Sequence, residues 1–200
     1  FPEIVVGDTV VARDLGHPLL PPATCVANDV TLGPPGSFLL VTGSNMSGKS
    51  TLLRAIGVNT VLAQAGGPVC ASSMQLPPVV LGTSFRVQDS LADGVSYFMA
   101  ELRRLKQVVD LAAEIDGDTV MLFLLDEILL GTNVAERQIA VQQVLGQLLE
   151  HRALGAVATH DLSLADADAT WSGGKVYDRA AGPDSIAYIG DMDGDGEPDI

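Results

Sequence analysis

Cysteines, basic residues and long apolar runs are all scarce in this 200-residue sequence. The two cysteines, Cys25 and Cys70, have a spacing that favours neither a disulfide scaffold nor a zinc site, so we expect a reduced, cytoplasmic setting. Eleven Lys and Arg against 25 Asp and Glu give a net charge of −14, which argues against nucleic-acid binding by this chain alone. No apolar run reaches the roughly 18 residues that span a bilayer, so we expect no membrane partner.

What the sequence does contain is an alternation of strand-like and helix-like segments. The expected strands are Ile4–Ala12, Cys25–Leu32, Ser37–Thr42, Val79–Val87, Thr119–Leu125 and Ala153–Thr159, and the expected helices are Lys49–Ala65, Ser96–Ile115 and Val134–His151. This alternation predicts an α/β fold in which helices flank a mostly parallel central sheet, with an antiparallel N-terminal part. In such folds ligands bind at the carboxyl ends of the strands.

Residues 43–50 fit the phosphate-binding pattern G-x-x-x-x-G-K-[ST], between an expected strand and an expected helix. Glycines let consecutive N–H groups point into one anion-sized cavity, and the helix adds the positive end of its dipole. Lys49 would add a charge toward the β- and γ-phosphates, and Ser50 is placed to bind Mg²⁺. The expected nucleotide-binding residues are Gly43, Ser44, Asn45, Met46, Ser47, Gly48, Lys49, Ser50 and Thr51.

Two acids and a histidine follow later expected strands and supply the parts that hydrolysis needs. Asp126 is the expected Mg²⁺ ligand, and Glu127 would orient or deprotonate the attacking water. His160, at the end of the next strand, would donate a hydrogen bond to the γ-phosphate. The alternatives are a solvated acid pair at a strand end and a structural histidine. The combination of motifs favours a Mg²⁺-dependent ATPase, with Glu127, Lys49 and His160 as catalytic residues.

Taken together, these motifs resemble the ATPase domain of the MutS family of DNA mismatch-repair proteins, a branch of the ABC-type P-loop ATPases. The resemblance runs from about His17 to Asp168 and includes the Asn-Met pair inside the phosphate loop. It rests on the segments Gly16–Leu20, Val41–Arg54, Asp89–Glu101, Leu125–Ile128, Gly131–Asn133 and Ala158–Asp161. The form of Gly131–Arg137 is closer to short MutS-like relatives than to members that recognise mismatches.

The resemblance implies ATP and Mg²⁺ as cofactors and a composite site between two subunits. In related proteins the serine matching Ser96 reaches the γ-phosphate bound by the partner, so we expect a homodimer or a MutS-like partner subunit. Cys25 stands where many members carry an aromatic residue that stacks on adenine.

Mismatch-reading, connector, lever and clamp domains do not fit in 200 residues, so we expect DNA contacts only through domains outside this chain. The expected function is ATP hydrolysis, with dimerisation on ATP, that drives a mismatch-repair or other DNA-maintenance protein. The alternative is an ATP-binding regulatory or interaction module with little turnover.

The last 31 residues depart from this pattern, so we divide the chain into an ATPase domain at 1–169 and an acidic tail at 170–200. The sequence from Asp191 to Gly196 has a D-x-D-x-D-G arrangement that is typical of Ca²⁺ loops and similar to those of FG-GAP-type propeller repeats. The candidate Ca²⁺ ligands are Asp191, Asp193, Asp195 and Asp199. Three interpretations stay open: a Ca²⁺ site, a solvated acidic end, and the junction of a fusion or truncation.

Overall fold

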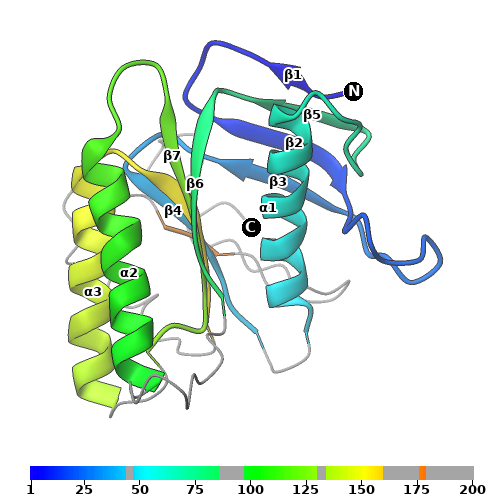
Figure 1. Ribbon diagram of the computed structural model, residues 1–200. Coiled ribbons are helices and arrows are strands. Elements are labelled where there is room, and N and C mark those ends of the chain that lie inside the picture. Colours follow the sequence, from blue (N-terminus) through cyan, green and yellow to red (C-terminus); the bar gives the residue numbers. More distant parts are fainter. Residues whose placement is uncertain (44–46, 86–96, 130–133, 160–175, 179–200) are drawn as a thin grey trace, which may run out of the picture.

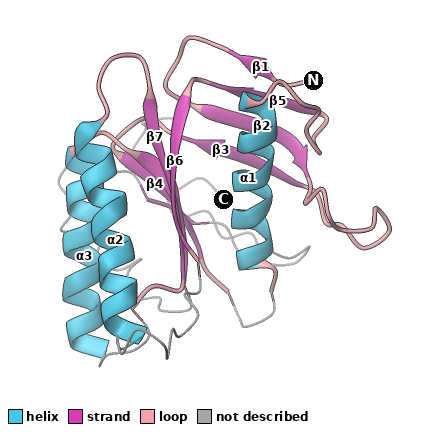
Figure 2. Cartoon of the chain, viewed as in Figure 1, coloured by secondary structure: helices cyan, strands magenta, loops and turns pink. Residues whose placement is uncertain are grey.

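The computed structural model describes residues 1–43, 47–85, 97–129, 134–159 and 176–178, which form two sheets and three helices (Figure 2). The larger sheet has the order β6 (Val79–Ser84), β7 (Val120–Asp126), β8 (Leu154–Ala158), β4 (Ser37–Val41) and β9 (Val176–Asp178), and all its pairs are parallel. The smaller sheet has the order β1 (Glu3–Ile4), β5 (Ser73–Leu76), β2 (Val10–Leu15) and β3 (Asn28–Leu32). In it β1 is parallel to β5, and the other two pairs are antiparallel. The predicted α/β architecture is therefore confirmed.

The helices lie on opposite faces of the parallel sheet (Figure 1). Helices α2 (Tyr97–Glu114) and α3 (Val134–Glu150) pack together on one face, while α1 (Lys49–Gln64) and the smaller sheet lie on the other. In the described part of the chain, no helix combines the length and apolarity needed to cross a bilayer.

The central strands are apolar apart from Ser37 and Asp126 at their ends, because both of their faces are buried. In β7, Leu122 and Leu124 point into the core shared with α1 and the smaller sheet. Met121, Phe123 and Leu125 point the other way, into the core shared with α2 and α3. Since side chains alternate along a strand, this continuous apolar run serves two cores and holds the end of β7 rigidly between them.

The expected single strand Ile4–Ala12 is wrong, since this region forms two strands. Strand β1 is parallel to β5 and β2 is antiparallel to it, so the chain must reverse direction between them, around Gly7 and Asp8. The next strand begins at Asn28 and not at Cys25. Two strands, β5 and β9, were not expected at all. Strand β9 falls in the segment 170–200 and pairs with β4.

Candidate functional site

The turn between β4 and α1 carries the first half of the candidate site. Gly43 has a φ of +142° and Gly48 a φ of +92°, conformations that favour glycine. Lys49, the first residue of α1, is only 4% exposed, and its Nζ donates a hydrogen bond to the Gly43 carbonyl at 2.8 Å. The ammonium group thus lies beside Gly43 and near the amino end of α1, where the helix dipole also favours an anion.

A hydrogen bond joins this turn to the end of β7. The Ser50 hydroxyl donates to Asp126 Oδ1 at 3.0 Å, across 76 residues of sequence. Burial raises the pKa of the Asp126 carboxyl, and the charge of Glu127 raises it further. The Ser50 hydrogen bond and the charges of Arg54 and Lys49 lower this pKa, but they do not offset the effect of burial. A cation bound at Asp126 would favour its ionised form.

Glu127 follows Asp126 directly and has a φ of +48°, which is uncommon for a residue other than glycine. Its N–H donates to the Ala158 carbonyl at 2.9 Å, and the Thr159 N–H donates to the Val41 carbonyl at 3.1 Å. These bonds connect the carboxyl ends of β7, β8 and β4, which are neighbours in the sheet. The acid pair and the phosphate-loop pattern therefore meet at the same edge, where ligands of parallel sheets bind.

The described residues suit a magnesium nucleotide. Magnesium usually takes one or two protein ligands and fills its other positions with phosphate oxygens and water. The Ser50 and Asp126 oxygens, in direct contact, are ligands of this kind. In the same turn the Ser47 hydroxyl is buried and has no hydrogen-bond partner among the described residues. A buried polar atom of this kind calls for a ligand or water, and a phosphate oxygen would satisfy it.

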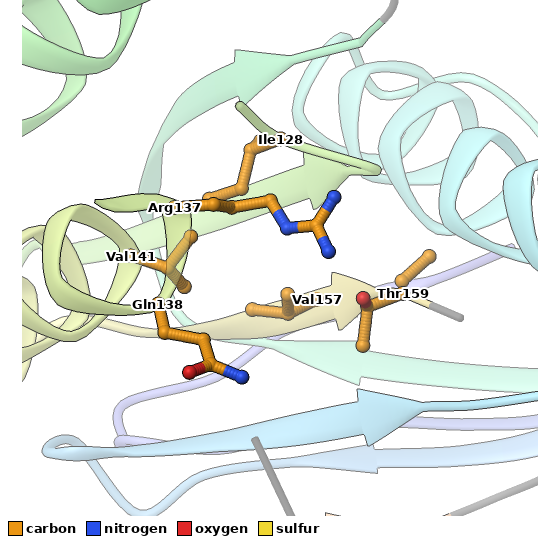
Figure 3. Close-up of a pocket in the computed structure, with 7 residues that line it drawn as sticks. Ile128, Arg137, Gln138, Val141, Val157 and Thr159 are labelled. Atoms are coloured by element: carbon orange, nitrogen blue, oxygen red, sulfur yellow. The ribbon is translucent and has the colours of Figure 1, made fainter. Parts of the chain in front are cut away.

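A hollow with room for about one water molecule lies beside Ile128, the residue that follows the acid pair in sequence (Figure 3). It is lined by Ile128, Arg137, Gln138, Val141, Val157, Ala158 and Thr159. The Arg137 side chain extends from α3 toward Thr159 at the end of β8. This hollow is too small for a nucleotide, so the candidate phosphate site stays the segment 43–50.

Several predicted site residues lie outside the described residues: Ser44, Asn45, Met46, Ser96, His160, Asp191, Asp193, Asp195 and Asp199. Their proposed contacts with nucleotide, partner or Ca²⁺ stay predictions. Within the described ranges, no group of three or more His, Cys, Asp or Glu side chains could hold a metal ion. Thr51 is exposed in the first turn of α1.

Sequence reasoning assigned no role to Asn59, which is fully buried in α1. Its side-chain amide donates to the Gly16 carbonyl at 2.9 Å and accepts from the Cys70 N–H at 2.6 Å. A Cβ atom on Gly16 would lie 2.8 Å from Cys25 Sγ, so this sulfur packs directly against the glycine. Asn59 thereby fixes the loop that holds Cys25 relative to α1. A polar residue at a buried helical position is the only sequence signal for this role.

Glu101 is a buried acid without a predicted role, although it is the last residue of the segment Asp89–Glu101. It lies one turn before Leu105 and two turns before Val108, both of which are buried. An acid on the apolar side of an amphipathic helix is the feature of the sequence that could have indicated a role for Glu101.

Comparison with known proteins places these features in a family. The family described as MutS domain V matches residues 39–181. A protein named Endonuclease MutS2 from Solidesulfovibrio magneticus is 36% identical over 169 residues, covering 80% of this chain and 21% of that protein. The protein of the same name from Thermus thermophilus is 32% identical over 175 residues, covering 79% of this chain and 23% of that protein.

A third relative carries a mismatch-repair name. The DNA mismatch repair protein MutS of Fusobacterium nucleatum is 30% identical over 167 residues, covering 80% of this chain and 18% of that protein. The chain thus spans about a fifth of the length of these curated relatives. With a family match that covers most of its residues, the chain belongs to the MutS domain V family.

Proposed function

We propose that this chain binds and hydrolyses ATP as the ABC-type P-loop domain of a MutS-like DNA-maintenance protein. The observation that carries the proposal is the contact between Ser50 and Asp126, with Lys49 folded over the same turn. It brings a hydroxyl, a carboxylate and an ammonium group to the amino end of one helix. This is the set of groups that phosphate and Mg²⁺ binding requires.

Each residue then has a defined task. The backbone N–H groups of residues 43–50 and the Lys49 ammonium group hold the phosphates, and Ser50 with Asp126 holds Mg²⁺. When bound, Mg²⁺ and ATP supply the polarised phosphoanhydride bond that water attacks. Glu127 positions this water and accepts its proton. His160 donates a hydrogen bond to the γ-phosphate, in line with the family resemblance.

A second subunit completes the site in this proposal. In the proposed arrangement, residues 43–50 would bind the phosphates from one side. The amino end of a partner's helix at Ser96 would cover the other side, exclude water and stabilise developing charge. Dimerisation on ATP and release on hydrolysis would then form a two-state switch.

DNA binding is assigned to domains outside this chain, because the net charge of −14 opposes contact with a polyanion. The name of the Fusobacterium relative includes DNA mismatch repair, and we extend a DNA-maintenance role to this chain on that basis. The domain boundary at residue 169 stays a proposal. The family match runs on to residue 181, and β9 also lies beyond that boundary.

Replacement of the water-positioning acid tests the function. We expect Glu127→Gln to lower the rate of ATP hydrolysis by about 10²- to 10⁴-fold, because the amide cannot accept the water's proton. The affinity for ATP should stay within about twofold of the wild type, because Glu127 is not assigned to phosphate binding. Steady-state phosphate release and equilibrium ATP binding measure the two effects.

Glu150→Gln is the matched control, since Glu150 is exposed at the end of α3. Its turnover should equal that of the wild type. Hydrolysis by Glu127→Gln at the wild-type rate would contradict the proposal.

A further inference from the structure

Glu101 is a buried acid that the proposed hydrolysis does not use. It lies in the second turn of α2 and is only 3% exposed, among apolar side chains that pack on the parallel sheet. Its Oε1 accepts a hydrogen bond from the Leu129 N–H at 2.6 Å, across 28 residues of sequence. Leu129 follows the acid pair by two residues, so the contact joins α2 directly to the segment that leaves β7.

The segment held by Glu101 has an unusual backbone. Glu127 has a φ of +48° and Leu129 a φ of +60°, and neither is a glycine. Such a conformation is strained for a residue other than glycine and persists only where its surroundings hold it. Two hydrogen bonds do so here: Glu127 N–H to the Ala158 carbonyl, and Leu129 N–H to Glu101. The Glu127 backbone is therefore fixed by β8 on one side and by α2 on the other.

The stability of the fold alone does not explain why residue 101 is a glutamate. Burial raises the pKa of the Glu101 carboxyl, although the Leu129 hydrogen bond acts against this effect. Its Oε2 is buried without a hydrogen-bond partner among the described residues. A glutamine could accept from Leu129 N–H without the cost of burying a charge. What the charged group adds is a shorter, stronger hydrogen bond to a strained peptide.

We propose that Glu101 is a positioning residue, whose carboxylate holds the 127–129 backbone so that the Glu127 side chain points at the attacking water. This inference rests on the proposed ATPase function. Glu101 touches neither nucleotide nor metal in this proposal and acts only through Glu127. Because α2 begins one residue after Ser96, the same hydrogen bond also ties the helix next to the proposed partner contact to the water-positioning acid.

Two replacements and a control on the same helix test the inference. Glu101→Gln keeps a weaker, uncharged acceptor for Leu129 N–H, and Glu101→Met keeps the side-chain length and removes the acceptor. We expect turnover to fall about two- to fivefold in Glu101→Gln and at least tenfold in Glu101→Met. ATP affinity should stay within about twofold in both. Glu114→Gln, an exposed position on α2, should match the wild type.

A second measurement does not depend on hydrolysis. Hydrogen exchange at the Leu129 amide should be faster in Glu101→Gln than in the wild type, and faster again in Glu101→Met. Failure of the ATPase proposal would appear as a lack of Glu127-dependent hydrolysis in the wild type, while the amide exchange still reports on the Glu101 contact.

The inference is overturned if folded Glu101→Met keeps wild-type turnover, or loses ATP affinity and turnover to the same extent. If Glu101→Met does not fold, Glu101→Gln decides. Wild-type turnover together with wild-type exchange at Leu129 in that variant would overturn the inference.

Discussion

At the scale of single residues, Lys49 shows how the phosphate turn is prepared for an anion. A buried ammonium group needs hydrogen-bond acceptors, and Lys49 Nζ uses the Gly43 carbonyl at the other end of the turn. That bond keeps the ammonium group beside Gly43, the first residue of the phosphate-loop pattern. A phosphate oxygen would be a better partner for this cation than a neutral carbonyl.

Lys49→Ala should therefore weaken ATP binding at least tenfold, which corresponds to about 1.4 kcal/mol or more. Lys106→Ala removes a lysine that is exposed on α2 and paired with Asp110, so its ATP affinity should not change. Titration of both variants with a fluorescent ATP analogue measures the effect. Unchanged affinity in Lys49→Ala would count against the assigned phosphate site.

At the scale of elements, the close approach of β7 and β8 sets the geometry of the site edge. A Cβ atom on Gly155 in β8 would lie 2.2 Å from the Phe123 carbonyl oxygen and 2.5 Å from its ring in β7. Only glycine allows this contact. Since β8 also supplies the Ala158 carbonyl that binds Glu127 N–H, a displaced β8 would move the acid pair too.

Gly155→Ala should lower the free energy of unfolding by about 3 kcal/mol or more, because overpacking against backbone cannot relax through a side chain. For a chain of this size the loss corresponds to a fall in Tm of at least about 6 °C. Gly7→Ala is the control, because a Cβ there meets nothing within 4 Å. Thermal unfolding followed by circular dichroism compares the two, and equal Tm values would contradict the packing argument.

Elements with a strong periodic pattern were predictable from the sequence. The first helix was expected at Lys49–Ala65 and spans Lys49–Gln64, and the third was expected at Val134–His151 and spans Val134–Glu150. Strand β5 was missed because its alternation covers four residues only, next to Pro77 and Pro78. Strand β9 is defined by its pairing with β4, and no local pattern in the sequence predicts this pairing.

In the site too, local motifs were predictable from the sequence and long-range contacts were not. The phosphate turn and the acid pair are local motifs, and their contact follows from the alternation of strands and helices. The roles of Asn59 and Glu101 depend on backbone groups of Gly16 and Leu129 that only the folded chain brings near. The positions of residues in the sequence do not indicate which distant backbone groups they will contact.

At the scale of the whole molecule, the proposed switch is a change in association state. In saturating Mg²⁺ and ATP, Glu127→Gln should form a stable dimer, because it binds ATP and hydrolyses it slowly. In ADP the same variant should stay monomeric, since the γ-phosphate that bridges the subunits is missing. Sedimentation velocity distinguishes the two states. A variant that stays monomeric in saturating ATP would refute the composite site.

Helix α1 is bonded both to the parallel sheet and to loops of the smaller sheet. Its first turn holds Lys49 and Ser50 at the parallel sheet, while Asn59, ten residues further on, is bonded to loops of the smaller sheet. Sixteen residues of helix form a stiff rod about 24 Å long. A tilt of a few degrees about the Asn59 anchor would shift its phosphate end by roughly an ångström. If phosphate binding tilts α1, the loop that carries Cys25 would be strained through the Asn59 hydrogen bonds.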